Sequence, residues 1–253
     1  MSAGLTILCY HRVLPDAELH GNGRPYFLRG TAVSIGAFRA QLAALCASFE
    51  IVAEADVLAW LAGERVFVRP ACWLTFDDGY ADVLSHAAPI LAELGAPATA
   101  FIATDVLDGG MLPADRWYAV LNKATRRRGT LEGGGTRWSF DLDSPPDYAR
   151  LVDGPERRRY LARTTKPERE TLLGEFAAAV GAPVPRSLDG LYMGGTSLRA
   201  LVDAGWSVGS HTQSHPFLPL LADDGMDAEL RGSRSALASV GIDARSFAYP
   251  NGR

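Results

Sequence analysis

The sequence predicts an α/β fold built on a parallel sheet, and two features of its patterning support this. Short apolar runs alternate along the chain with longer segments of helical periodicity, as in repeated strand–helix–strand units. The short runs are almost continuously apolar, which is typical of strands that are covered on both faces. The chain has 253 residues, 47% of them hydrophobic, so it can bury the core of one domain or of two small ones.

Six of the apolar runs are expected to form the strands. In chain order they are residues 5–10, 50–52, 71–76, 98–103, 206–210 and 246–249. Four segments between them have the pattern of helices, at 35–48, 82–94, 196–204 and 223–240. Ser34 is a suitable N-cap for the first helix. A glycine that can end a helix follows each of the other three, namely Gly95, Gly205 and Gly241.

A stretch from about residue 115 to 185 interrupts this alternation. It contains arginine runs at 126–128 and 157–159 and three glycines at 133–135. We interpret it as an insertion of short helices and a hairpin at 137–142, within a single domain that spans 1–253. The arginine runs either bind an anionic substrate group or form a solvated helix face, and the second use is the more common.

Charge and composition exclude several classes of function. A net charge of −4 gives no general attraction to DNA, RNA or anionic membranes, so no nucleic-acid partner is expected. Cys9, Cys46 and Cys72 are an odd number in apolar stretches and are expected to be buried and reduced. The apolar run at the start is too short for a signal peptide or a membrane span, which predicts a cytoplasmic protein.

Two adjacent carboxylates follow the third expected strand. In the motif TFDDGY, Asp77 and Asp78 lie at the carboxyl end of this strand, the edge where α/β folds place ligands. A cation bound to one carboxylate would offset the cost of crowding two charges and leave the other free as a base. The alternative is a plain strand-end turn, since Asp-Asp-Gly is ordinary turn chemistry.

Two histidines follow the fifth expected strand, in the sequence SHTQSHP. If the chain turns helically here, His211 and His215 share one face and can bind the same metal ion. Pro216 would limit the helix to a single turn. The alternative is a pair of exposed polar histidines.

Two further motifs end the last and the first strands. The Pro-Asn-Gly turn of FAYPNG exposes backbone N–H groups that can face a developing oxyanion, although a plain turn is the simpler interpretation. The motif YHRV places His11 after the first strand, where a structural histidine is the more common case. In a barrel-like sheet all four motifs would meet at one rim. Asp78, His211 and His215 would then bind a metal ion and leave positions open for water and substrate, as a catalytic zinc requires.

Together these motifs resemble the polysaccharide deacetylase superfamily, carbohydrate esterase family 4. The resemblance covers most of the chain outside the insertion. TFDDGY is similar to the family's first motif, which implies Asp77 as the base and Asp78 as a metal ligand. SHTQSH is similar to the second motif, which implies His211 and His215 as the other ligands. The resemblance also implies a distorted (β/α)7-type barrel and Zn2+, or another divalent ion such as Co2+ or Ni2+.

The third motif departs from the common family pattern. FAYPNG has Ala248 where many relatives have an arginine that steadies the base, so another group must orient Asp77. Asn251 falls where the family supplies a backbone N–H to the oxyanion, which implies a catalytic role for it.

The end of the chain is a second departure, because relatives usually continue with further strands and a catalytic histidine. CYHRV resembles the start of circularly permuted relatives, whose histidine comes from an N-terminal Y-H motif, and this implies His11 as the general acid. The barrel is then expected to be incomplete at its C-terminus, with an open sheet edge that a partner could cover.

The sequence therefore predicts a metal-dependent hydrolase that removes an N-acetyl or other acyl group from a carbohydrate. Two alternatives stay open. One is a truncated, inactive relative that only binds carbohydrate, and the other is an amidase or deformylase acting on a small substrate.

Overall fold

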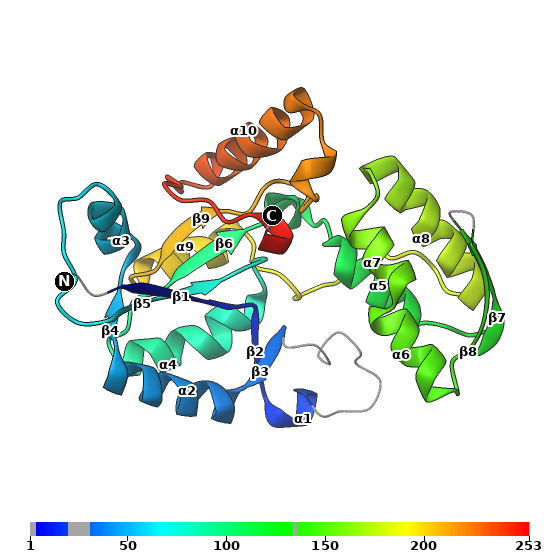
Figure 1. The fold of residues 1–253 in the computed structure, drawn as a ribbon, viewed down its shortest axis with the longest axis horizontal. Coiled ribbons are helices and arrows are strands. Elements are labelled where there is room, and N and C mark those ends of the chain that lie inside the picture. The colour runs from blue at the N-terminus through cyan, green and yellow to red at the C-terminus, as the bar shows by residue number, and fades with distance from the viewer. Residues whose placement is uncertain (1–3, 20–30, 134–135, 253) are drawn as a thin grey trace.

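The computed structural model describes residues 4–19, 31–133 and 136–252 (Figure 1). The strands are β1 (Leu5–Tyr10), β2 (Arg12–Leu14), β3 (Ala32–Ser34), β4 (Glu50–Val52), β5 (Ala71–Phe76), β6 (Thr99–Ile102), β7 (Arg128–Gly133), β8 (Thr136–Asp141) and β9 (Ser207–Ser210). The α-helices are α1 (Asp16–Leu19), α2 (Ile35–Ser48), α3 (Glu54–Leu61), α4 (Ala88–Glu93), α5 (Pro113–Asn122), α6 (Pro145–Asp153), α7 (Pro155–Ala162), α8 (Lys166–Val180), α9 (Gly195–Asp203) and α10 (Asp223–Ser239). Shorter helical segments are the π-turn η2 (Val83–Ala87) and the 3₁₀ turns η3 (Thr104–Asp108), η4 (Leu218–Leu220) and η5 (Pro250–Gly252).

A parallel sheet with helices around it forms the larger part of the molecule, as the sequence predicts. The strand order is β1-β5-β6-β9, and β4 also pairs with β5. β1 runs beside the whole length of β5, from Leu5 opposite Ala71 to Tyr10 opposite Phe76. Because all of these strands are parallel, the loops after their carboxyl ends lie on the same side of the sheet.

The expected strand at 246–249 is wrong. Phe247 makes a single parallel bridge to Ser210 at the end of β9. Two backbone hydrogen bonds hold this bridge, in which Ser210 N donates to Ser246 O and Ala248 N donates to Ser210 O, each at 3.0 Å. The pairing cannot extend further because Pro250 has no N–H and begins η5.

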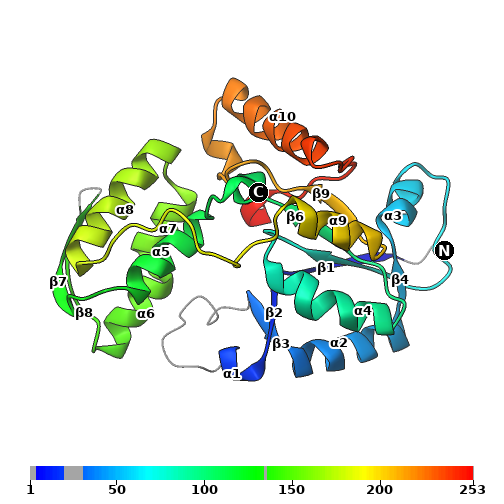
Figure 2. The same ribbon diagram turned by 180° about the vertical axis from the view of Figure 1, so that it is seen from behind.

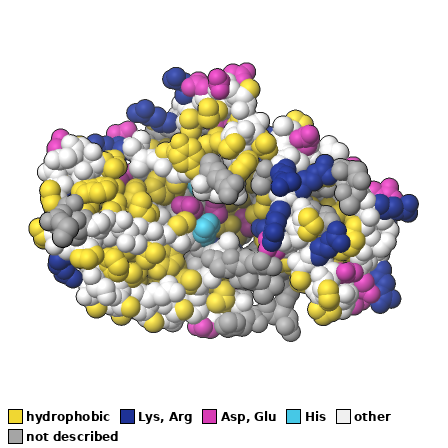
Figure 3. All heavy atoms as spheres, viewed as in Figure 1, with side chains coloured by type: hydrophobic (Ala, Val, Ile, Leu, Met, Phe, Trp, Pro, Cys, Tyr) yellow, Lys and Arg dark blue, Asp and Glu magenta, His cyan; other side chains and the backbone are white. Residues whose placement is uncertain are grey.

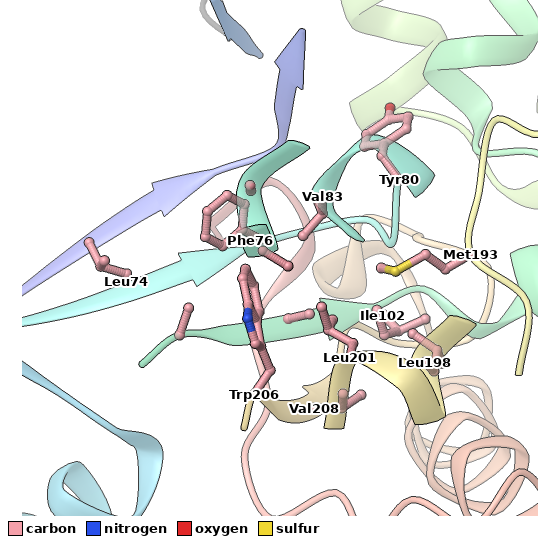
Figure 4. Close-up of a cluster of buried hydrophobic side chains, with 14 of the residues drawn as sticks. Leu74, Phe76, Tyr80, Val83, Ile102, Met193, Leu198, Leu201, Trp206 and Val208 are labelled. Carbon is pink, nitrogen blue, oxygen red and sulfur yellow. The ribbon is translucent and has the colours of Figure 1, made fainter. Parts of the chain in front are cut away.

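β5 is buried on both faces, and its alternate side chains enter two hydrophobic clusters. Leu74 and Phe76 join the larger cluster, which helices α2, α4 and α9 cover. Figure 4 shows Phe76 beside Trp206, and their ring centroids are 5.0 Å apart. On the other face, Trp73 packs against Phe101 and its Nε1–H donates to Thr99 Oγ1 at 2.9 Å. Burial on both faces is therefore confirmed for this strand.

β1 is different, because it is the edge strand of an incompletely closed barrel. Within the described residues it pairs with β5 alone. The Ile7 side chain is 55% exposed and Cys9 is exposed, so the expectation of a fully covered strand is wrong for β1. The edge position explains the exposure, since in the described part of the chain no strand pairs with the far side of β1. A partner that covers this edge stays a prediction.

The helices of the larger part follow the predicted boundaries closely. α2 spans the predicted residues, and Ser34 Oγ accepts a hydrogen bond from Ala37 N at 3.1 Å. The helix expected at 82–94 is confirmed in position, but its first turn is the π-turn η2. Gly95, Gly205 and Gly241 all have positive φ and follow α4, α9 and α10, as expected. No helix of the described ranges is long and apolar enough to cross a membrane.

The insertion runs in the structure from α5 to α8 and lies to one side of the sheet in both views (Figures 1 and 2). Its hairpin, expected at 137–142, is formed by β7 and β8. The helices and hairpin enclose a hydrophobic cluster of their own, in which Trp117 stacks on Phe176 with ring centroids 4.0 Å apart. The description of 1–253 as one domain stays a prediction.

Candidate active site

The predicted site residues gather at the carboxyl ends of β1, β5 and β9, where a cavity of about 380 Å³ opens. We call this region the rim, which comprises residues 11, 77–80, 211–217 and 249–252. Figure 3 shows histidine and acidic side chains in a hollow between the sheet and the insertion. The residues that line the cavity include all six predicted from the sequence: His11, Asp77, Asp78, His211, His215 and Asn251. The cavity volume lies in the usual range for small-molecule sites, about 300–1,000 Å³.

Asp78, His211 and His215 place three potential ligand atoms together. Asp78 Oδ1 lies 3.6 Å from Nε2 of His211 and 3.4 Å from Nε2 of His215. Ligands at about 2.0–2.1 Å around a tetrahedral zinc ion are about 3.4 Å from one another. These spacings therefore match three ligands of a single ion.

The same carboxylate oxygen also needs a partner. Asp78 Oδ1 is buried and has no hydrogen-bond partner among the described residues. A buried charged oxygen without a partner is unfavourable, and a bound cation removes that cost. The donor set of one carboxylate and two imidazoles thus fits a divalent metal ion.

Both histidines present a ring nitrogen that is suited to metal binding. The Nδ1 atom of His211 lies 2.9 Å from the Ala248 carbonyl oxygen, a contact in which Nδ1–H donates and Nε2 keeps its lone pair toward Asp78. Burial lowers the pKa of His215 to about 4, so its imidazole is neutral at pH 7. A neutral imidazole is the form that binds metal.

The expectation that a helical turn brings the two histidines together is wrong. Thr212 and His215 have left-handed backbone conformations, with φ of 65° and 53°, and the segment between them is a loop. Asp78 and Asn251 are also left-handed, with φ of 80° and 58°. In the described part of the chain these four are the only residues other than glycine with positive φ. Such conformations are costly and tend to occur at functional sites.

Glu229 of α10 holds the histidine loop in place, a role that the sequence does not predict. Its Oε2 atom accepts hydrogen bonds from Gln213 N at 2.9 Å and from Ser214 N at 2.8 Å. Its Oε1 atom accepts from Ser214 Oγ. These bonds satisfy backbone donors that a helical turn would leave unpaired, which accounts for the loop. Glu229 lies 14 residues beyond His215 on a polar helix, so no local pattern could have revealed it.

Cys9 takes part in orienting Asp77, where many relatives would use an arginine. The thiol donates to Asp77 Oδ2 at 3.2 Å. Desolvation of the thiol and the Asp77 charge raise the pKa of Cys9, so the thiol stays protonated and able to donate. Cys72 is buried as expected, but the expectation for Cys9 is wrong because the residue is exposed on the edge strand.

Asp77 itself lies in an environment that favours a base. Its N–H donates to Tyr10 O at 2.9 Å, which fixes the backbone at the end of β5. Burial raises the pKa of Asp77 above its usual value, despite the opposing effect of nearby histidines. A carboxylate with a raised pKa accepts a proton from water more readily.

His11 is partly exposed in the cavity, with Nε2 4.0 Å from Asp78 Oδ2. The next residue anchors it, since the buried Arg12 donates through Nε to Asp82 Oδ2 at 2.8 Å. Asp82 Oδ1 accepts from Val13 N at 2.9 Å. The YHRV motif therefore holds its histidine at the rim through a buried ion pair.

A second group of potential ligand atoms lies beside the first. It consists of Cys9, His11 and Asp77, whose potential ligand atoms lie within 4.8 Å of one another.

A buried network joins the rim to the insertion. Asp115 of α5 accepts hydrogen bonds from the hydroxyls of Tyr80, at 2.9 Å, and Tyr192. Burial raises the pKa of Asp115 to about 6. In the sequence, Asp115 marks only the approximate start of the insertion. Its partners lie 35 and 77 residues away along the chain, so the network has no local signature.

Comparison with known families identifies the class of protein. The model of the polysaccharide deacetylase family matches residues 66–127 and 189–253, which together make up half of the chain. The chain belongs to the polysaccharide deacetylase family. The unmatched residues 128–188 contain most of the insertion.

Solved structures of deacetylases have a similar fold. The Streptococcus pyogenes deacetylase PplD in complex with acetate has a TM-score of 0.59 and 17% sequence identity, covering 100% of this chain and 76% of that chain. IcaB from Ammonifex degensii has a TM-score of 0.57 and 20% identity, covering 99% and 76% of the two chains. A de-N-acetylase from Aggregatibacter actinomycetemcomitans has a TM-score of 0.58 and 14% identity, covering 98% and 80%. No curated protein matches the chain.

Proposed function

We propose that this chain is a metal-dependent deacetylase that hydrolyses an N-acetyl or other acyl group on a carbohydrate. The observation that supports this most directly is the buried Asp78 Oδ1, which has no hydrogen-bond partner and faces Nε2 of His211 and His215. Asp77 lies beside this group in the same cavity. Membership of the polysaccharide deacetylase family supports a carbohydrate as the substrate.

Asp78, His211 and His215 would hold the ion, which we propose to be zinc or another divalent metal such as cobalt or nickel. Bound there, it would supply positive charge that polarises an acyl carbonyl and lowers the pKa of water. Before a metal binds, His215 is already neutral. The hydrogen bond from His211 to the Ala248 carbonyl already orients the His211 ring.

The remaining residues of the rim would move protons and stabilise charge. Asp77, steadied by the Cys9 thiol, takes a proton from the attacking water. The backbone N–H of Asn251 donates to the acyl oxygen as negative charge develops on it. His11 gives a proton to the departing amine, so that the carbon–nitrogen bond breaks and acetate and a free amine are released.

The cavity also offers a surface for a sugar ring. Tyr249 lines it and is 60% exposed, so its ring is free to stack on the apolar face of a saccharide.

Acetate release from N-acetylglucosamine oligomers tests the proposal. The purified chain should release acetate, stop when a chelator removes the metal, and recover when zinc or cobalt is added. Metal content should be measured on the same samples. A folded chain that binds one zinc ion and releases nothing would contradict the substrate, and a chain that binds no zinc would contradict the metal site.

A further inference from the structure

Arg157 of α7 brings a cation from the insertion into the candidate active site. It lines the same cavity as His11 and Asp78. Its side chain is only 14% exposed, whereas that of the neighbouring Arg158 is 67% exposed. Arg157 also lies in the segment that the family model leaves unmatched. The insertion thus adds a positive charge to the catalytic cavity that the matched part of the family does not account for.

Arg157 is held in place but keeps hydrogen-bonding capacity. Its guanidinium carbon lies 4.8 Å from the centre of the Tyr118 ring, and Nη1 is 3.4 Å from Asp153 Oδ1. The Nε–H is buried and has no hydrogen-bond partner among the described residues. A buried donor without a partner is unfavourable, so the guanidinium keeps unused hydrogen-bonding capacity. The Asp153 contact does not meet this need, because it is made through Nη1.

Arg157 shares the Asp153 carboxylate with a second arginine of α7. Asp153 also accepts a hydrogen bond from Arg158 Nη2 at 3.1 Å, so one carboxylate serves two guanidinium groups. Lysine and arginine side chains gather on the insertion side of the hollow in Figure 3. The acidic residues of the cavity, by contrast, include Asp77 and Asp78 at the proposed metal site.

We propose that Arg157 forms a subsite for an anionic group on the acylated sugar, a carboxylate or a phosphate, and so selects acidic over neutral saccharides. This inference rests on the proposed function. Guanidinium groups bind both anions through paired N–H donors, and such charge-assisted hydrogen bonds are roughly twice as strong as neutral ones. The face of Tyr118 and the partial burial limit the movement of the guanidinium, which lowers the entropy lost on binding.

Three matched sugars test the subsite: N-acetylglucosamine, its 6-phosphate, and the uronic acid with a carboxylate at the same carbon. Acetate release by the zinc-loaded chain gives kcat/KM for each. The wild type should prefer at least one acidic sugar by about tenfold or more, and which of the two it prefers identifies the anion. Arg157→Gln should remove most of this preference, chiefly through KM. Arg137→Gln is the matched control and should leave the preference unchanged, because Arg137 lies on the hairpin of the same insertion, is mostly exposed and is not among the residues that line the cavity.

A binding experiment separates the subsite from the catalytic proposal. Calorimetry with the same sugars gives the ratio of Kd values without any need for turnover. Preferential binding of an acidic sugar that Arg157→Gln abolishes supports the subsite, even where no acetate is released and the proposed function fails. Equal binding of the neutral and acidic sugars by the wild type overturns it, as does an unchanged ratio in Arg157→Gln. Arg157→Lys, which keeps the charge, should retain part of the preference and provides the same test if Arg157→Gln does not fold.

Discussion

At the rim, buried carboxylates have oxygens that lack hydrogen-bond partners, whereas the surface of the insertion holds exposed ion pairs in which both charges are satisfied. The buried oxygens without a partner are Oδ1 of Asp77 and Oδ1 of Asp78. An exposed ion pair of the insertion is formed by Arg127 and Asp143, which are both more than half exposed. The nitrogen and oxygen of this pair are 2.7 Å apart. Buried groups without partners cost stability and are kept where a ligand completes them, while exposed pairs contribute little. The comparison therefore distinguishes buried charges, which take part in ligand binding and catalysis, from exposed charges, which interact mainly with water.

The largest effect among the supporting residues is expected at Glu229. Glu229→Ala removes the acceptor for two backbone N–H groups of the histidine loop. Zinc affinity or activity should fall about 10- to 100-fold, as is typical when a residue that orients a metal ligand is lost. A zinc titration and acetate release measure this effect. Asp227→Ala, whose partner Arg231 is on the same exposed face of α10, is the control and should change neither quantity.

A smaller effect is expected at Cys9. Cys9→Ala removes the thiol that donates to Asp77 and should lower kcat about tenfold, while zinc affinity stays the same. Cys9→Ser keeps a donor and should recover most of the activity. Equal kcat values for Cys9→Ala and the wild type would show that the thiol does not position the base.

The network between the two regions should respond to pH. Because the pKa of Asp115 in the folded chain, about 6, lies above its ordinary value of 3.8, the folded state binds this proton more tightly than the unfolded state does. The associated stability is fully present below about pH 4 and is lost as the pH rises through 6. Relative to Asp115→Asn, the metal-free wild type should lose up to about 3 kcal/mol of unfolding free energy between pH 4 and pH 7. Urea unfolding of both chains across this range measures the difference, and a constant difference would contradict the burial effect.

The smallest effect is expected at the tip of the insertion. Arg137 and Glu132 form an exposed ion pair across the hairpin, with nitrogen and oxygen 3.1 Å apart. Arg137→Ala should change the free energy of unfolding by less than about 1 kcal/mol and leave acetate release unchanged. A larger loss in urea unfolding would mean that exposed pairs of the insertion contribute more than the comparison implies.

The sequence predicts the site residues better than it predicts how they are held. Asp77, Asp78, His211 and His215 can be found because catalysis and metal binding need these side chains directly after strands, and parallel strands end at one edge. The structure places them in one cavity, although their roles remain proposals.

The supporting contacts could not be predicted, because they join residues far apart in the chain. Glu229 binds a loop from a separate helix, and Cys9 contacts Asp77 across 68 positions. The strand expected at 246–249 fails for a related reason, since its apolar pattern does not reveal that only one residue pairs with β9. Within the insertion, the position of Arg157 depends on packing against Tyr118, which an arginine run does not specify.

The central claim is that the two adjacent carboxylates have different roles, Asp77 as the base and Asp78 as a metal ligand. The most direct test is to measure zinc content and acetate release for Asp77→Asn and for Asp78→Asn. Asp77→Asn should retain one zinc ion per chain and lose turnover about 10²- to 10⁴-fold, because only the base is removed. Asp78→Asn should lose both zinc and turnover, because a ligand is removed. A fully active Asp77→Asn chain, or an Asp78→Asn chain that keeps zinc with unchanged affinity, would contradict the account.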